Sequence, residues 1–229
     1  MKELDAMKSE KSKKESSGFD LIPVVFGAQT KHVLKVSNFL LKEERDHLLE
    51  TVCTHQSAFK PLGIPDPDGG GTLHLSLGPE NNGSSEIEPI RKVCEPLANK
   101  IETLLPKIFE MLGVTPFPVS KIPLSIGNGL NGHTGSVHND ESGGRFKISI
   151  LYYFHKIPKV FQGGALELFA TDEDAQDGYE KSPFAKIEHE DNLLIAFPSE
   201  TYHGVTDVTL DSTKFEEGRF VIVGFLGSQ

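Results

Sequence analysis

The stretch RFKISILYYF at residues 145–154 decides the fold. Its β-branched and aromatic residues favour a strand. Side chains two positions apart on a strand point to the same face, so Ser149, Leu151 and Tyr153 are predicted to lie on one side. The strand therefore offers two hydroxyl groups, those of Ser149 and Tyr153, to one pocket.

Further runs of the same kind follow in this half of the chain, separated by Gly, Pro, Asn and Asp, which mark turns. They are FPVSKIPLSIG at 117–127, GGALELFA at 163–170, DNLLIAF at 191–197 and GRFVIVGFL at 218–226. Many short strands with Gly-rich turns are typical of a barrel or a jelly roll.

The first half of the chain has apolar residues at helical spacing. The pattern predicts a short strand at 31–37, a helix at 38–56 and a long helix or helix pair at 84–113, interrupted at Pro96 or Pro106. The predicted fold class is therefore α+β and mainly β, with helices that support a β-rich core.

The charged, serine-rich residues 1–18 are predicted to form a mobile tail. Residues 19–229 are predicted to form one domain, with helical support at 38–113 and a β core at about 116–228.

The composition limits the partners and the compartment. The net charge is -10, which argues against a nucleic-acid partner, because such proteins normally carry a basic face. No apolar run reaches the roughly 18 residues that span a bilayer, and the N-terminus shows no signal-peptide pattern. Cys53 and Cys94 are expected to stay reduced in the cytoplasm. The sequence leaves the oligomeric state open.

A candidate metal site begins at SVHNDES, residues 136–142, where His138 and Asp140 are two positions apart. The motif is short, so it could also be a solvated surface pair. A facial-triad Fe(II) site needs two imidazoles and one carboxylate. His203 follows the apolar strand at 191–197 and is the predicted third ligand.

A second copy of the motif, His189-Glu-Asp191, stands directly before a strand. There a turn is the simpler interpretation. At the head of the last strand, Arg219 has no carboxylate obviously reserved for it. A dicarboxylate co-substrate would supply one.

In their order, His138-x-Asp140, Gly163-Gly164, His203 and Gly218-Arg219 resemble the Fe(II)- and 2-oxoglutarate-dependent dioxygenases. The likeness is to the prolyl 4-hydroxylase-like branch and covers residues from about 120 to 228, with a weaker echo at 36–50.

The resemblance implies a double-stranded β-helix, a distorted jelly roll, in which His138, Asp140 and His203 are metal ligands and catalytic. It implies that Arg219 binds the far carboxylate of 2-oxoglutarate, with Tyr153 and Ser149 beside it as co-substrate-binding residues. The implied cofactors are Fe(II), 2-oxoglutarate and O2, with ascorbate as a further candidate, and the products are succinate, CO2 and a hydroxylated aliphatic carbon.

This chain departs from the family pattern in several places. Ser149 stands where threonine is usual, and Arg219 stands where lysine is frequent, after a longer loop. The segment SIGNGLNGHTGSV, 125–137, has Asn and Gly where the branch often has tyrosines. Related halogenases lack the carboxylate ligand, so Asp140 favours hydroxylation.

The implied substrate is a small molecule or an amino acid, with a peptidyl proline as the alternative. One rival is a cupin-like metal enzyme that needs no 2-oxoglutarate. A second rival is a non-enzymatic binding module that keeps the fold. No membrane partner is expected.

Three other histidines and two long polar segments remain. His133 is interpreted as a loop histidine or a substrate contact, His74 as a candidate for the pocket lining, and His155 as an exposed residue. Segments 60–72 and 171–188 are either lids or solvated insertions.

Overall fold

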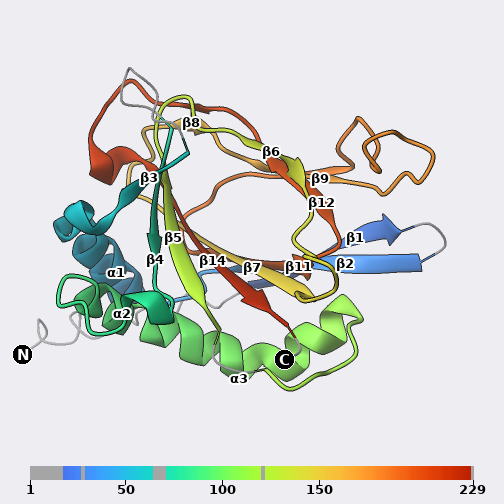
Figure 1. Ribbon diagram of the computed structural model, residues 1–229, viewed down its shortest axis with the longest axis horizontal. Helices are drawn as coiled ribbons and strands as arrows, with labels where there is room; N and C mark the ends of the chain where they lie inside the picture. Colours follow the sequence, from blue (N-terminus) through green and yellow to red (C-terminus); the bar gives the residue numbers. More distant parts are fainter. Residues whose placement is uncertain (1–17, 27–28, 64–70, 120–121, 228–229) are drawn as a thin grey trace, which may run out of the picture.

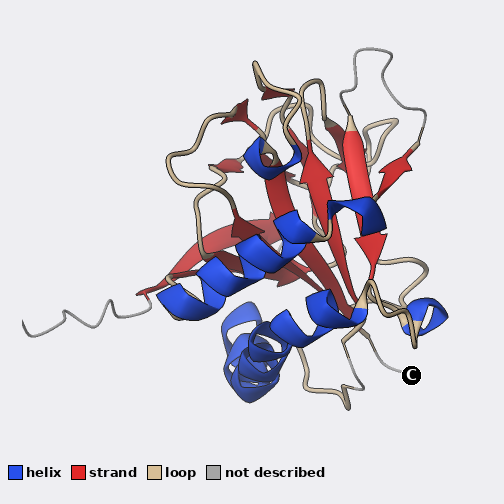
Figure 2. Cartoon of the chain, turned by 90° about the vertical axis from the view of Figure 1, so that its left-hand side faces the viewer, coloured by secondary structure: helices blue, strands red, loops and turns tan. Residues whose placement is uncertain are grey.

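A computed structural model describes residues 18–26, 29–63, 71–119 and 122–227. The predicted mobile tail lies outside the described residues except for Gly18, at which the first strand begins. Two antiparallel sheets face each other, and the helices cover the outer side of the larger one (Figures 1 and 2).

The larger sheet has eight strands, and in spatial order they are β1 (Gly18–Phe26), β2 (Gln29–Ser37), β11 (Leu193–Pro198), β7 (Ile148–Phe154), β14 (Arg219–Leu226), β5 (Leu124–Gly129), β4 (Thr72–Ser76) and β3 (Lys60–Leu62). The smaller sheet is β10 (Ala185–Ile187), β9 (Leu166–Phe169), β12 (Tyr202–Val205) and β6 (Gly135–His138). A two-stranded ladder joins β8 (Gln162–Gly163) and β13 (Val208–Thr209).

Three helices accompany the sheets, α1 (Lys42–Thr54), α2 (Glu88–Val93) and α3 (Glu95–Leu112). Single 3-10 turns lie at Gln56–Ala58, Pro79–Asn81 and Phe215–Glu217. No helix in the described ranges is both long and apolar enough to cross a membrane.

Strand β7 lies in the middle of the large sheet and is buried on both faces. Ile150 and Tyr152 pack with Leu97 and Ile101 of α3 in the larger core. Leu151 and Tyr153 point the other way, and they join a second core with Leu166 and Leu168 of the small sheet. The period-two alternation of this strand thus builds both layers.

The five predicted β runs are confirmed as β5, β7, β9, β11 and β14. The strand predicted at 31–37 is confirmed as β2, whereas β1 was not predicted. The helix predicted from residue 38 begins only at Lys42, because Asn38 has a φ of 52°, which is incompatible with a helix.

The predicted break near Pro96 is confirmed, since α3 begins at Glu95. Proline is tolerated in the first turn, where its missing N–H leaves no hydrogen bond unmade. Pro106, the other predicted break, lies within α3.

Arg45 of α1 ties the helical layer to the β core. It is 6% exposed, and its Nη2 lies 2.6 Å from Asp191 Oδ1. It also donates a hydrogen bond to the carbonyl of His155. The prediction that His155 is exposed is wrong: its side chain is buried and lies edge-on to Phe161.

We expect Arg45→Ala to lower the free energy of unfolding by about 2–4 kcal/mol, because the Asp191 carboxylate loses its partner in a largely buried place. Urea denaturation measures this change. Lys42→Ala is the control, since Lys42 forms an exposed pair with Asp46 and its loss is expected to change the free energy of unfolding far less. Equal effects of the two substitutions would contradict the role given to Arg45.

Candidate metal centre

Two strands of the small sheet bring three metal-binding side chains together. His203 of β12 lies directly opposite His138 of β6, and the two rings are 4.4 Å apart. Asp140 Oδ1 lies 3.5 Å from His138 Nε2, and its Oδ2 lies 3.4 Å from His203 Nε2. The potential ligand atoms all lie within 4.8 Å of one another, close enough to bind one ion.

Asp140 lies just beyond β6, which ends at His138. The backbone N–H of Asp140 donates to the carbonyl of Ser199 at 2.8 Å, and this bond holds the turn. Ser149 of β7 donates its hydroxyl to Asp140 Oδ2 at 2.7 Å. Ser149 thus orients the carboxylate, while the sequence had suggested a place beside the co-substrate.

Backbone carbonyls fix the orientation of both imidazoles. His138 Nδ1 lies 2.7 Å from the carbonyl of Ser136, and His203 Nδ1 lies 2.9 Å from that of Thr201. A carbonyl oxygen only accepts, so each Nδ1 carries a proton, and each Nε2 is the ring nitrogen that faces Asp140 and could bind a metal ion when it is deprotonated. The sequence analysis did not identify Ser199 or Thr201. Both act through backbone carbonyls, which every residue has, so their side chains give no signal.

The charges of the cluster support one another. Burial by itself would raise the pKa of Asp140, but His138, His203 and Ser149 outweigh it, so the pKa is lowered. The hydrogen bond to Asp140 raises the pKa of His138, whereas burial lowers that of His203. An ionised carboxylate beside two imidazoles is the donor set that non-haem Fe(II) sites use.

Arg219 lies in the same interior without a carboxylate. It is 2% exposed, its Nε donates to the carbonyl of Gly164 at 2.7 Å, and its guanidinium lies 5.0 Å from the centre of the Tyr153 ring. Burial lowers the pKa of Arg219, and no acidic side chain in the described part of the chain forms an ion pair with it. Such a cation calls for an anionic ligand.

Tyr153 completes this arrangement. Its hydroxyl is buried and meets the geometric criteria of a hydrogen bond with no described residue, but it lies close enough to Arg219 for the guanidinium to act on the phenol through its charge and a loose polar contact. Burial raises the pKa of Tyr153 and the charge of Arg219 opposes the rise, so the hydroxyl keeps its proton at pH 7 and can donate. Ser149 and Tyr153 point to one face, as predicted.

The second glycine of the pair in the β8–β9 turn is required by the packing of Arg219. Gly163 and Gly164 both have a φ of +69°, which strongly favours glycine. A Cβ on Gly164 would lie 2.5 Å from Arg219 Cδ and 2.7 Å from its Nε. The arginine therefore occupies the space that a side chain at Gly164 would need.

The second His-x-Asp motif does not form a cluster of metal-binding groups. Asp191 pairs with Arg45, and Asn192 has a φ of 56° directly before β11, as a turn requires. His189 is buried and stacks on the Tyr153 ring, with centroids 4.2 Å apart.

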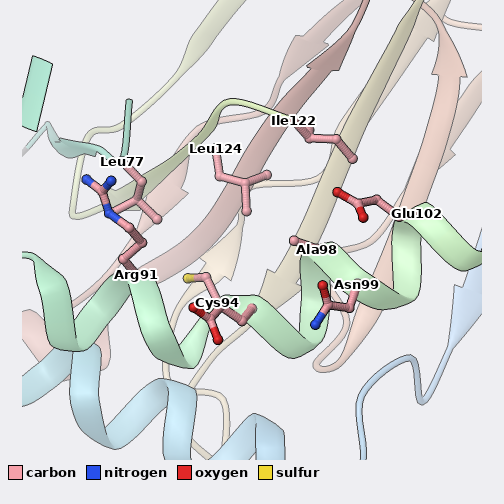
Figure 3. Close-up of a pocket in the computed structure, with 9 residues that line it drawn as sticks. Leu77, Arg91, Cys94, Ala98, Asn99, Glu102, Ile122 and Leu124 are labelled. Atoms are coloured by element: carbon pink, nitrogen blue, oxygen red, sulfur yellow. The ribbon is translucent and has the colours of Figure 1, made fainter. Parts of the chain in front are cut away.

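A cavity elsewhere on the molecule is separate from the metal cluster. This cavity, of about 290 Å³, lies between the helices and the ends of β4 and β5 (Figure 3). None of the three candidate metal ligands, His138, Asp140 and His203, lines it. It is lined by Leu77, Arg91, Cys94, Glu95, Ala98, Asn99, Glu102, Ile122 and Leu124. The metal cluster instead opens toward solvent at His138, whose side chain is 52% exposed.

Comparison with known proteins agrees with this geometry. Residues 123–227 match the model of the 2OG-Fe(II) oxygenase superfamily. An uncharacterized PKHD-type hydroxylase of Synechocystis is 30% identical over 133 residues, which cover 57% of this chain and 44% of that relative. The matched stretch thus spans less than half of the relative's length.

Two solved structures share the fold. A Pseudomonas putida prolyl-4-hydroxylase gives a TM-score of 0.58 at 16% identity, covering 87% of this chain and 94% of that one. A Trichoplax adhaerens prolyl hydroxylase, solved with a hypoxia inducible factor oxygen degradation domain peptide fragment, gives 0.60 at 16% identity, covering 86% and 83%. These matches confirm the predicted double-stranded β-helix.

The superfamily implies Fe(II), 2-oxoglutarate and O2, and the donor set of the His-Asp-His cluster fits the metal. Residues 123–227 of this chain are therefore similar to the 2OG-Fe(II) oxygenase superfamily, in sequence as in fold.

Proposed function

We propose that this protein is an Fe(II)- and 2-oxoglutarate-dependent dioxygenase that hydroxylates an unactivated aliphatic C–H bond and releases succinate and CO2. The observation that carries the proposal is the buried cation of Arg219, which lacks a carboxylate among the described residues and lies in the same interior as a His-Asp-His cluster. A metal site alone would fit many enzymes, whereas the added anion site fits a dicarboxylate co-substrate.

Strand β7 relates the two parts of the site. Ser149 bonds Asp140 at one end of its inner face, and Tyr153 lies against Arg219 at the other. Four residues on a strand span about 13 Å. Between them lies Leu151, which belongs to the apolar core between the sheets. A co-substrate bound along this face would reach from the metal ligands to the arginine.

Each side chain has a distinct role in this proposal. His138, Asp140 and His203 would hold Fe(II) and leave coordination positions open. Arg219 would bind the far carboxylate through two parallel hydrogen bonds, and Tyr153 would donate a third. When bound, the ion and 2-oxoglutarate supply the oxidising chemistry.

We also propose that residues 19–229 act as one domain, and that ascorbate supports the iron.

We propose a small molecule or an amino acid as the substrate, because β5 carries Asn128 and Gly129 where tyrosines were expected. A peptidyl proline is the second candidate. Two observations support it: two neighbours of known structure are prolyl hydroxylases, and His138 is half exposed. Succinate release with free amino acids, compared with release with proline-containing peptides, distinguishes the two. The cytoplasmic location stays a prediction.

Anaerobic titration with Fe(II) and 2-oxoglutarate is expected to produce the weak visible charge-transfer band of the complex. His203→Ala should abolish the band, since one imidazole is lost. Arg219→Ala should raise the 2-oxoglutarate concentration for half-saturation by roughly tenfold or more, because a charge-assisted contact is removed. Arg219→Lys keeps the charge, so its 2-oxoglutarate concentration for half-saturation should lie between those of the native protein and Arg219→Ala.

Iron binding without a band in the native protein would contradict the proposal. A cupin-like enzyme would then be favoured if turnover occurred without succinate, and a binding module if no turnover occurred with a broad substrate panel.

Gly164→Ala is expected to weaken 2-oxoglutarate binding roughly tenfold, because the added Cβ meets Arg219 and displaces its guanidinium. Gly83→Ala is the matched control, since Gly83 also has a positive φ, of +81°, but a Cβ there meets nothing within 4 Å. Both substitutions strain the backbone, so only a difference in binding between them, measured in the same titration, supports the packing argument.

A further inference from the structure

The strand next to Arg219 lacks a side chain at the position where one would contact the arginine. Gly129 of β5 pairs with Arg219 of β14 on one side and with Thr72 of β4 on the other. Residues directly opposite each other on antiparallel strands point to the same face. A place without a β5 side chain therefore lies between Thr72 and Arg219, on the face that Arg219 occupies.

The ring of His133 fills this place. A Cβ on Gly129 would lie 2.7 Å from His133 Cδ2 and 3.0 Å from its Cγ. The Thr72 hydroxyl is hydrogen-bonded to His133 Nδ1. At Gly127, the other glycine on this face, a Cβ would meet Val221 and not His74. Of these two glycines, only Gly129, which pairs with Arg219, has a histidine ring in the space where its side chain would be.

The loop that carries His133 is held at its backbone. The backbone N–H of His133 donates to the carbonyl of Leu130 at 3.0 Å, and the carbonyl of His133 accepts from the N–H of Val208 at 2.8 Å. Val208 in turn pairs with Gly163, next to the residue whose carbonyl binds Arg219. The backbone that carries the imidazole is thus held at both its N–H and its carbonyl.

The electrostatics suit an anion. Burial lowers the pKa of His133 to about 4, and the charge of Arg219 contributes, so the ring is neutral at pH 7. If the Thr72 hydroxyl donates to Nδ1, the neutral ring carries its proton on Nε2. A donor then lies beside a guanidinium, and the described residues contribute no carboxylate to either group.

We propose that His133 is a further co-substrate-binding residue, whose Nε2–H donates a hydrogen bond to the far carboxylate of 2-oxoglutarate beside Arg219. This inference rests on the proposed function and deepens it. A loop histidine would then supply the polar contact for which β5 has only glycine, in the segment where tyrosines were expected.

The test compares two 2-oxo acids in the anaerobic Fe(II) titration, 2-oxoglutarate and 2-oxobutyrate, which lacks the far carboxylate. His133→Phe should raise the dissociation constant of 2-oxoglutarate roughly tenfold to hundredfold, as expected for the loss of a hydrogen bond to a charged group. The constant for 2-oxobutyrate should stay within about threefold. His133→Gln, which keeps a terminal N–H donor, should restore most of the affinity for 2-oxoglutarate.

His47→Phe is the control, because His47 is exposed on α1. A His133→Phe variant that binds 2-oxoglutarate like the native protein would overturn the inference and leave the proposed function intact. Equal weakening of both acids would also overturn it, since that result indicates a general loss of structure. A native protein that binds iron but gives no band with 2-oxoglutarate would refute the proposed function and this inference together.

Discussion

The antiparallel pairing of β6 with β12 is the constraint on which the candidate metal centre depends. It sets His203 opposite His138, although the two residues are far apart in the sequence. A slip of one residue would turn one imidazole to the other face of the sheet. The pairing of β12 with β9 on its other side resists such a slip, because β9 is anchored in the core between the sheets.

Strand β7 extends this constraint across the interior. One face carries Ile150 and Tyr152 into the helical layer, and the other carries Ser149 and Tyr153 into the site. The same strand, β7, therefore packs on α3 with one face and orients the polar groups of the site with the other. Sites built on strands of this kind keep their geometry better than sites built on loops alone.

The sequence predicted the chemistry of the site better than its surroundings. His138 and Asp140 were identifiable by their spacing of two residues, and His203 and Arg219 by their positions next to apolar strands. Ser199 was not identifiable, because its role depends on a backbone carbonyl in the turn after β11, which accepts a hydrogen bond from the N–H of Asp140. The predicted exposure of His155 was wrong, because residues from other parts of the chain cover it: Arg45 of α1 bonds its carbonyl, and Phe161 lies against its ring.

By itself, the sequence determined the β-rich class, the central strand and its two-faced pattern, since side-chain alternation is a local property of the chain. Only the tertiary structure decided that His133 occupies the space above Gly129 and that Arg219 occupies the space beside Gly164. A glycine in a sequence indicates freedom of the backbone or room for a neighbour, but not which neighbour. That choice is made by strand register and loop closure, which connect residues that the chain keeps far apart.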